Sequence, residues 1–558
     1  MLLGKRCTGP CSTDSHLIPY LRCASREIQH TKEPTPSRGI MNVPTKVPAT
    51  YIEAWDSAVA THPHAPFLLF HSDEKVWTQW SYSEFDKHVE RVTACLVNLG
   101  VQRDHSVHLC LRNSPAFIAV QLACARLRAW TVPVDPASSP RDIARQISRT
   151  APTVGIAAEA RSETYRAGAA GQLNQILLLH EDERDFTEIS AFYPKKGHDL
   201  SATTPARPED RLAVMFTSGT TSEPKGVVLT QANYATLTRS MAELANLGPQ
   251  HRWFISLPMF HANAQFYCLA PAIGAGASVA LSSKFSASGW LQQAREAKAT
   301  HASLFAAPIR MILNRTAKDS EPLHLTHVWF AQNLNHSQYT AFTKLAGTQP
   351  RQLYGMTETV TIVTRDNNSN PSHDTIGRAV PGRKILLVDP STLDPVSSGE
   401  PGLLLLGGKR GHDIFQEYLN RPEANKSAFV SVNGQEWFVT GDLVRTSRDG
   451  TLTFVGRIDD VTKIAGENVS LTELEARISE APEVAEVAVV AVDDPIRDHA
   501  AVAYVVPEKF VADHVTAESL TRWAEKHLAP ACRPKEWHLI DELPRTSVGK
   551  IRKFKLAR

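Results

Sequence analysis

The sequence predicts an α/β protein with a large N-terminal domain of layered α/β subdomains and a small, mobile C-terminal α+β domain. Three observations lead to this prediction. The chain has 558 residues, too many for one hydrophobic core, since domains typically hold about 100–200 residues. From Tyr51 to about residue 455, short apolar strands alternate with helices, a pattern typical of buried, largely parallel sheets. After Gly456 a short charged run leads into a different pattern of elements, which indicates a second domain.

The first elements follow one another in this alternating order. A helical pattern over Glu84–Leu99 stops at Gly100, and glycine commonly ends helices. The apolar run Ser106–Leu111 predicts a strand, and Pro115–Arg126 predicts the helix that follows it. The run Ala129–Val134 predicts the next strand, so the layered α/β arrangement is set early in the chain.

The C-terminal region has its own elements. The charged run that begins at Arg457 marks a boundary, with a hinge near Asp459. We therefore expect an N-terminal domain over residues 41–457 and a C-terminal lid domain over residues 458–558. The elements expected in the lid are, in order, a helix over Leu471–Ile478, strands over Val484–Val492 and Ala500–Val506, and a helix over Ala517–His527.

Composition excludes several classes of protein. Sixty basic residues against 58 acidic ones give a net charge of only +2, which provides no electrostatic case for nucleic acid or an anionic membrane as partner. No apolar run approaches the ~20 residues that a membrane-spanning helix needs. Eight cysteines without regular spacing indicate thiols in a reducing compartment, so we expect a cytoplasmic protein. Residues 1–40 show no apolar period and are expected to be a disordered extension.

A loop rich in small and hydroxylated residues joins two apolar strands within residues 212–230. Its backbone N–H groups, hydroxyls and lysine suit a polyphosphate. It is not a Walker A motif, because Gly-Lys-Ser/Thr is missing and no helix is expected after it. Such a loop is usually a solvated turn, but the Pro224-Lys225-Gly226 that follows favours a phosphate site. The candidate nucleotide-binding residues are Thr217, Ser218, Gly219, Thr220, Thr221 and Lys225.

Two short motifs farther along add groups that suit a nucleotide. Tyr354-Gly-Met-Thr-Glu358 places an aromatic ring, a hydroxyl and a carboxylate within one short segment. Such a set can stack a base, bond a phosphate and bind Mg²⁺, which prefers oxygen ligands. Trp437-Phe-Val-Thr-Gly-Asp442 is expected to end a strand with an acid that can accept two ribose hydroxyls. Either motif alone is commonplace in turns, so each counts only in combination.

Two motifs near the C-terminus complete a set of five. The segment from Gly456 to Glu473 includes Arg457, Lys463 and Gly466 and is specific as a whole. Pro544-Arg-Thr-Ser-Val-Gly-Lys550-Ile-Arg552 places a lysine directly after a glycine. A terminal basic run alone is usually a solvated face, but the five motifs in this order indicate one shared function.

In these motifs the chain resembles the adenylate-forming (ANL) superfamily, which contains acyl-CoA synthetases, the adenylation domains of peptide synthetases and firefly luciferase. The resemblance covers about residues 50–555. Thr217-Ser-Gly-Thr-Thr-Ser222, Tyr354-Gly-Met-Thr-Glu-Thr359 and Gly466-Glu-Asn-Val-Ser470 are most similar to the crotonobetaine/carnitine-CoA ligase branch. Acyl-CoA ligases of natural-product pathways, including that of platensimycin/platencin, look similar. The resemblance implies an acyl-CoA synthetase-like fold.

The resemblance implies an acid–thiol ligase that uses ATP, Mg²⁺ and coenzyme A. A carboxylate attacks the α-phosphate of ATP to give acyl-AMP, and after a rotation about Asp459 the thiol of coenzyme A takes the acyl group. Tyr354 would stack on adenine, while Asp442 and Arg457 would hold the ribose. The residues that the resemblance implies in catalysis are Lys550, Glu358, Thr357, Lys463, Gly466 and His261, with Glu358 as the Mg²⁺ ligand.

Three of these implied roles have a simple physical reason. Thr357 would contact the α-phosphate, which gains charge as the carboxylate attacks. Lys550 would neutralise that charge, and a cation that acts only in the transition state accelerates the step selectively. Gly466 would line the pantetheine tunnel, where any side chain would narrow the passage.

Two segments depart from the pattern of the superfamily. Ser222 stands where most members have glycine, and Phe330-Ala-Gln-Asn-Leu-Asn335 replaces a glycine-rich turn that faces adenine. Side chains at Gln332 and Asn333 would crowd the nucleotide. Two alternatives therefore stay open: a ligase that only thioesterifies a preformed acyl-adenylate, and a non-catalytic acyl- or nucleotide-binding homologue. A carrier-protein thiol is an alternative acceptor to coenzyme A.

The acyl pocket is expected near Phe260-His261, which is similar to the acyl-pocket gate of the family. The candidate lining residues are His261, Asn263, Ala264, Gln265 and Gln332. An Asn/Gln pair beside Phe266 predicts a partly polar acyl group rather than a plain long alkyl chain. The sequence identifies neither the acid nor the oligomeric state.

Overall fold

The computed structural model describes most of the chain beyond residue 46. The described residues are 47–182, 184–186, 204–217, 224–317, 319–464, 467–494, 498–508, 514–545 and 551–556. The predicted extension lies outside them, as do the site candidates Ser218, Gly219, Thr220, Thr221, Gly466 and Lys550. Contacts group residues 47–558 as one unit, so the boundary expected between residues 457 and 458 stays a prediction.

One sheet has nine strands in the order β15-β14-β13-β12-β11-β9-β10-β1-β2. The strands from β13 to β1 run parallel, and antiparallel strands close both edges. The strands span β1 Pro66–His71, β2 Trp77–Ser81, β9 Arg252–Ile255, β10 Ser278–Ser282, β11 His301–Phe305, β12 His327–Ala331, β13 Arg351–Tyr354, β14 Thr364–Arg365 and β15 Arg378–Ala379. The carboxyl ends of the parallel strands therefore share one edge, where ligands bind in open α/β sheets.

A second sheet has seven strands in the order β18-β8-β7-β4-β3-β5-β6. The strands from β7 to β6 are parallel, whereas β8 and β18 are antiparallel additions. They span β3 Ser106–Cys110, β4 Trp130–Pro133, β5 Val154–Ala158, β6 Ile176–Leu179, β7 Arg211–Thr217, β8 Lys225–Thr230 and β18 Glu417–Tyr418. The largely parallel sheets predicted from the alternating pattern are confirmed.

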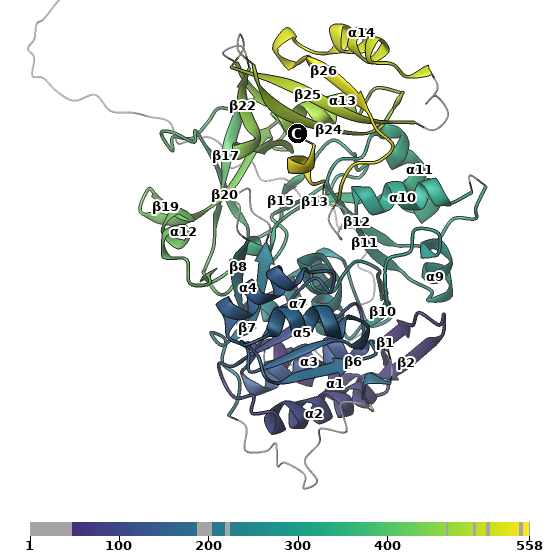
Figure 1. The fold of residues 1–558 in the computed structure, drawn as a ribbon, viewed down its shortest axis with the longest axis vertical. Helices are drawn as coiled ribbons and strands as arrows, with labels where there is room; N and C mark the ends of the chain where they lie inside the picture. The colour runs from purple at the N-terminus through teal and green to yellow at the C-terminus, as the bar shows by residue number, and fades with distance from the viewer. Residues whose placement is uncertain are drawn as a thin grey trace, which may run out of the picture. The chain divides into compact units, whose positions relative to one another are not determined.

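Helices connect these strands and pack between them (Figure 1). They are α1 Tyr51–Thr61, α2 Tyr82–Asn98, α3 Pro115–Leu127, α4 Pro140–Thr150, α5 Ser162–Ala169, α7 Gln231–Leu244, α8 Ala270–Ala275, α9 Trp290–Glu296, α10 Ala306–Arg315 and α11 His336–Ala346. Helix α3 is buried at every position except Arg126, as a helix enclosed within a core must be. Its residues join the strands of both sheets in one apolar core. The early helices and strands all lie within two residues of their predicted bounds.

A third sheet follows, with β16 Lys384–Val388, β17 Pro401–Gly407, β19 Phe429–Val432, β20 Gln435–Thr446 and β21 Leu452–Arg457, beside helix α12 Pro422–Ser427. One prediction is wrong here, because β20 does not end at Asp442 but continues to Thr446. Gly441 has a φ of +76°, and the β17–β20 register shifts around it. This bulge turns the chain without ending the strand, and Asp442 then pairs with Arg457 on β21.

The C-terminal part, yellow-green to yellow in Figure 1, is an antiparallel β-hairpin followed by an α/β layer. Its elements are β22 Val461–Ile464, β23 Glu467–Ser470, α13 Leu471–Ile478, β24 Val484–Asp494, β25 Asp498–Pro507, α14 Ala517–His527 and β26 Glu536–Leu539. Both predicted helices have the bounds expected for them. The apolar faces of α13, α14 and the strands form a core of their own, so the predicted small α+β domain is confirmed.

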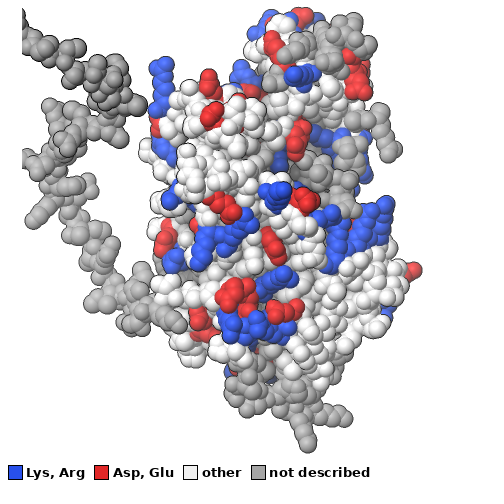
Figure 2. All heavy atoms as spheres, turned by 90° about the vertical axis from the view of Figure 1, so that its left-hand side faces the viewer, with Lys and Arg blue, Asp and Glu red and all other residues white. Residues whose placement is uncertain are grey.

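Two general features of the described residues bear on binding partners. No helix among them is both long enough and apolar enough to cross a bilayer. Basic and acidic side chains lie interspersed on the face that Figure 2 shows.

Candidate active site

The β7–β8 hairpin forms one wall of a cavity of about 590 Å³. Thr217 at the end of β7 pairs with Lys225 at the start of β8, and both side chains line the cavity. The loop between residues 218 and 223 lies outside the described residues. Strand β8 begins at Lys225, so the two predicted strands are confirmed, and the motif differs from a Walker A loop, which a helix follows.

A short turn after β13 places Glu358 on the wall of the same cavity. Thr357–Thr359 form a single 3₁₀ turn, and both Thr357 and Glu358 line the cavity. The Glu358 side chain is almost fully buried, and the Tyr418 hydroxyl donates to its Oε1 atom at 3.1 Å. Burial raises the pKa of the Glu358 carboxyl, although this hydrogen bond and the Arg457 charge oppose the shift. A buried carboxylate of this kind favours a cationic partner.

Tyr418 is a site residue that the sequence analysis missed. It lies on β18, opposite Val227 of β8, and Lys225 Nζ sits 4.9 Å from the centre of its ring. Asn425 fixes the Tyr418 backbone by accepting from its N–H at 2.6 Å and donating to its carbonyl at 2.9 Å. Tyr418 therefore touches the two charged candidates of opposite sign, one through its ring and one through its hydroxyl.

A second group of candidates is joined by hydrogen bonds around Asp442. The Tyr354 hydroxyl donates to Asp442 Oδ2 at 2.5 Å, and Arg457 Nη1 lies 3.2 Å from Oδ1. Burial raises the pKa of Tyr354 well above its usual value, so the phenol stays protonated and acts as the donor. Asp442 is itself buried, and its backbone N–H donates to the Thr440 hydroxyl. Tyr354, Asp442 and Arg457 are thus held together before any nucleotide binds.

The turn that carries Glu358 is held by a buried arginine that the sequence analysis also missed. Val360 has a φ of +61°, a conformation that a β-branched residue rarely adopts. Arg383 donates to the carbonyl oxygens of Thr359, Thr361 and Asp413 around this residue. Burial lowers the pKa of Arg383 to about 10, so the guanidinium remains charged at neutral pH. Arg383 therefore fixes the strained turn next to Glu358.

One of the acyl-pocket candidates lines the cavity in the structure and the others do not. His261 lines the cavity, and burial lowers its pKa to about 4, so the imidazole is neutral at physiological pH. Asn263 is buried beside it, and its amide donates to the Ser303 hydroxyl at 2.9 Å. Ala264 is fully buried and is not among the described residues that line the cavity.

Gln265 and Gln332 lie elsewhere. Gln265 is fully buried, accepting from Gln121 at 2.5 Å and from the Tyr234 hydroxyl at 2.6 Å, and its amide donates to the Met259 carbonyl. Its polar atoms are therefore committed to the core. Gln332 is exposed, with a φ of +73°, and lines a different pocket. The structure thus brings only His261 of the acyl-pocket candidates to the wall of the cavity.

The hinge candidate lies at the edge of the cavity. Asp459 lines it next to Arg457, on a short 3₁₀ turn over Ile458–Asp460. Lys463 is exposed on β22, pairs with Asn468 and is not among the described residues that line the cavity. Neither Gly466 nor Lys550 can be placed, since both lie outside the described residues.

The donors around the cavity allow one kind of cation site. In the described part of the chain, no group of three or more His, Cys, Asp or Glu side chains could hold a metal on its own. Mg²⁺ commonly binds through one or two carboxylates together with substrate phosphates. Glu358, with Lys225 and Thr217 lining the same cavity, fits that arrangement when a triphosphate is present.

Comparisons with known proteins identify the family of the chain. Residues 55–419 match the model of the AMP-binding enzyme family, and residues 473–550 match the AMP-binding enzyme C-terminal domain. The crotonobetaine/carnitine–CoA ligase of Salmonella paratyphi A is 30% identical over 512 residues, covering 90% of this chain and 98% of the relative. Its Salmonella typhimurium counterpart is 28% identical over 515 residues, covering 90% of this chain and 98% of the relative.

Solved structures show the same fold. ATP-bound MatB from Rhodopseudomonas palustris superposes with a TM-score of 0.80 at 23% identity, covering 91% of this chain and 98% of that one. A benzoate CoA ligase from Burkholderia xenovorans superposes with a TM-score of 0.78 at 22% identity, covering 91% of this chain and 100% of the other. The predicted fold class is therefore confirmed.

Proposed function

The chain belongs to the AMP-binding enzyme family and is an AMP-forming acyl-CoA ligase, and from that premise we propose that it makes acyl-CoA in two steps at the described cavity. In the first step an acid carboxylate attacks the α-phosphorus of ATP, the bond to pyrophosphate breaks, and acyl-AMP forms. In the second step the thiol of coenzyme A attacks the acyl carbonyl, AMP leaves and the thiol proton passes to solvent. The observation that carries the proposal is the convergence of Lys225, Glu358 and Arg457 on one cavity beside His261.

The nucleotide would lie between the two hydrogen-bonded groups of the site. We assign the ribose to Asp442 and Arg457, whose polar atoms already face one another, and adenine to the face of Tyr354. The phosphates go to the loop between Thr217 and Lys225, including Ser218, Gly219, Thr220 and Thr221. Support comes from Lys225 and Arg457, which both line the cavity, so that a triphosphate bound there meets positive charge.

We assign Mg²⁺ to Glu358, together with phosphate oxygens. When bound, the ion would offset the charge of the triphosphate and polarise its phosphoryl oxygens. The chain's own contribution is to hold the carboxylate fixed, since Tyr418 donates to it and Arg383 restrains the adjoining turn. Thr357, next in the chain, would donate to the α-phosphate.

The C-terminal part would supply the remaining groups. Lys550 would reach the α-phosphate during adenylation, while Lys463 and Gly466 would serve the transfer to coenzyme A. This division needs movement about Asp459 between a part comprising residues 41–457 and one comprising residues 458–558. The position of Asp459 supports this movement, because Asp459 lines the cavity and is one of the first residues of the C-terminal part.

For the acid, we propose a partly polar acyl group. His261 is neutral and can both donate and accept a hydrogen bond at the cavity wall. The relatives named for crotonobetaine and carnitine also point to small polar acids. Cytoplasmic location and a place in a natural-product pathway stay predictions.

A panel of acids tests the proposal. The full chain is incubated with ATP, Mg²⁺ and single acids, namely butyrate, 3-hydroxybutyrate, crotonobetaine, benzoate and palmitate, and products are read by mass spectrometry. We expect acyl-AMP without coenzyme A and acyl-CoA with it, most from a polar acid. No acyl-AMP or acyl-CoA from any acid would refute the ligase assignment for these substrates, and a preference for palmitate would refute the polar acyl group.

A further inference from the structure

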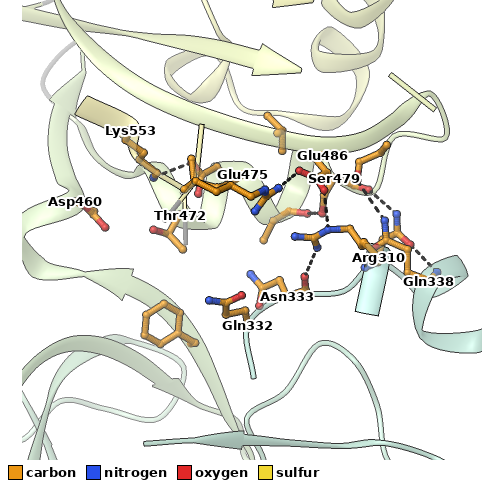
Figure 3. A pocket seen from close by; sticks show the side chains of 17 residues that line it. Arg310, Gln332, Asn333, Gln338, Asp460, Thr472, Glu475, Ser479, Glu486 and Lys553 are labelled. Carbon is orange, nitrogen blue, oxygen red and sulfur yellow. Dashed lines mark hydrogen bonds and ion pairs between the residues drawn. The ribbon is translucent and has the colours of Figure 1, made fainter. Parts of the chain in front are cut away.

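A second pocket, of about 300 Å³, lies where the C-terminal part meets the rest of the chain. Figure 3 shows Arg310 and Gln338 approaching it from one side and Ser479 and Glu486 from the other. Arg310 belongs to α10 and Gln338 to α11, whereas Ser479 follows α13 and Glu486 belongs to β24. Most of the labelled side chains are charged or carry amides, so charged and hydrogen-bonded contacts can form across this junction.

Glu486 is shared by two arginines across this junction. Arg310 Nε donates to its Oε1 atom at 3.3 Å, and the guanidinium of Arg545 donates to its Oε2 atom. The three side chains are only 14–19% exposed, so water screens their charges less than at an open surface. Arg310 also donates to the carbonyl of Asn333 at 3.1 Å. The contact therefore connects the Phe330–Asn335 turn with the C-terminal part.

Two neutral hydrogen bonds lie beside this ion pair. Asn335 and Gln338 form the capping box at the start of α11. The same two side chains also donate across the junction, Gln338 to the Ala485 carbonyl at 3.2 Å and Asn335 to the Ser479 carbonyl at 3.5 Å. The residues that begin α11 thus also dock the C-terminal part.

We propose that Arg310, Glu486 and Arg545 form a latch that holds the C-terminal part in the arrangement for adenylation and opens before acyl transfer to coenzyme A. This proposal rests on the two-step reaction proposed above. Arg545 pairs with Ile551 in an isolated β-bridge, and Pro544 accepts from the Arg552 backbone N–H at 2.7 Å. Glu486 is therefore connected through Arg545 to Ile551, the residue that follows Lys550 in the sequence.

The latch explains why the Phe330–Asn335 segment departs from the glycine-rich turn of the superfamily. Its Asn333 carbonyl accepts from Arg310, and its Asn335 side chain caps α11 and donates to Ser479. A glycine-rich turn would lack the Asn335 side chain. In this chain the segment therefore positions the C-terminal part, and Asn333 and Asn335 are positioning residues rather than catalytic ones.

Not every ion pair in this pocket belongs to the latch. Lys553 Nζ lies 2.7 Å from Glu475 Oε1, but both residues belong to the C-terminal part. That pair would persist when the parts separate. The Arg310–Glu486 contact would break, because its partners come from α10 and β24.

Two variants test the latch in the full chain. Glu486→Gln leaves Arg310 and Arg545 facing each other without a carboxylate, and Arg310→Met removes the contact from the opposite side while sparing Glu486–Arg545. Glu480→Gln is the matched control, since its exposed pair with Arg477 lies within the C-terminal part. Trypsin cleavage near Arg457 and Lys463 is timed in native protein, because such cleavage follows the population of the open form.

We expect both latch variants to release the C-terminal fragment about tenfold faster than wild type, and Glu480→Gln to match wild type. Release at the wild-type rate in both latch variants would overturn the proposal. This readout needs no acid, so it tests the latch even if the acid panel refutes the proposed function.

A second readout separates the latch from general damage. With the panel acid that gives the fastest wild-type pyrophosphate release, adenylation should fall about tenfold in both variants. Transfer from the enzymatically made acyl-AMP to coenzyme A should stay within about twofold of wild type. Equal losses in both steps would indicate a merely structural role and overturn the latch.

Discussion

The nucleotide cavity and the junction pocket are held together in opposite ways. In the cavity, Glu358 and Asp442 are buried, and each accepts a hydrogen bond from a buried tyrosine of the same part of the chain. At the junction, Glu486 is shared by partly exposed arginines from two parts of the chain. Buried hydrogen-bonded groups favour a rigid site, whereas charged contacts between two parts of a chain can break. We therefore expect the large part to be preorganised and the C-terminal part to move.

The largest effect at the nucleotide cavity is expected from Glu358→Gln. The amide keeps the volume of the side chain and can still accept from Tyr418, but it cannot carry the charge that we assign to Mg²⁺ binding. Acyl-AMP formation should fall about 10²–10³-fold, as when one charge-stabilising group is removed from an active site. The rate of pyrophosphate release measures acyl-AMP formation. Glu417→Gln, one residue before Tyr418 and more exposed, should retain wild-type activity, and a Glu358→Gln rate within tenfold of wild type would contradict the assignment.

A smaller loss is expected from Tyr418→Phe. The ring and its contact with Lys225 remain, and only the hydroxyl that bonds Glu358 is removed. Adenylation should slow about tenfold, the value of a hydrogen bond to a charged group. Tyr418→Leu, which also loses the ring, should slow it further, as measured by the same pyrophosphate assay. Equal rates for Phe and Tyr would show that the hydroxyl does not orient Glu358.

Acid should weaken the large part through its buried histidines. His108 is fully buried, and burial lowers its pKa to about 4 from 6.5. The unfolded chain binds a proton at this residue as pH falls below 6.5 and the folded chain does not, so stability is lost from pH 6.5 toward 4. Between pH 7 and 5 this residue alone should cost about 2 kcal/mol. Urea unfolding of wild type and His108→Gln at several pH values measures this loss of stability. The same pH dependence of the unfolding free energy in both proteins would contradict the lowered pKa of His108.

The smallest effect is expected when the ionic strength is raised, because salt screens the charges at the junction. Raising the ionic strength to about 0.5 M should screen the partly exposed Arg310–Glu486 contact and speed tryptic release of the C-terminal part about twofold. The Glu486→Gln variant corrects for salt effects on trypsin itself, because it has no such contact to screen. A salt effect of the same size in both proteins would show that charge does not hold the junction.

Helix caps and the spacing of apolar residues predicted those elements whose bounds depend on neighbouring residues in the sequence. Helices α13 and α14 match their predicted bounds because Ser470 and Thr516 cap amphipathic segments. The apolar runs before Thr217 and after Lys225 likewise predicted strands β7 and β8. The strand end expected at Asp442 was wrong, because the glycine before it makes a bulge rather than a turn.

The unpredicted residues act through distant contacts. Tyr418 bonds Glu358 from 60 residues away, and Arg383 reaches the Thr359 carbonyl from 24 residues away. No pattern near either residue marks it, because its function depends on how separate sheets come together. Gln265 shows the opposite error. The sequence placed it in the acyl pocket, but its side chain is hydrogen-bonded inside the core.

Exchange of labelled pyrophosphate into ATP, measured without coenzyme A, tests the central claim most directly. A site that is preorganised for the nucleotide should catalyse acid-dependent exchange in the wild-type chain, and Glu358→Gln should slow this exchange by about 10²–10³-fold. Exchange no faster than without acid, while supplied acyl-adenylate is still converted to acyl-CoA, would contradict the claim and show a ligase that only thioesterifies.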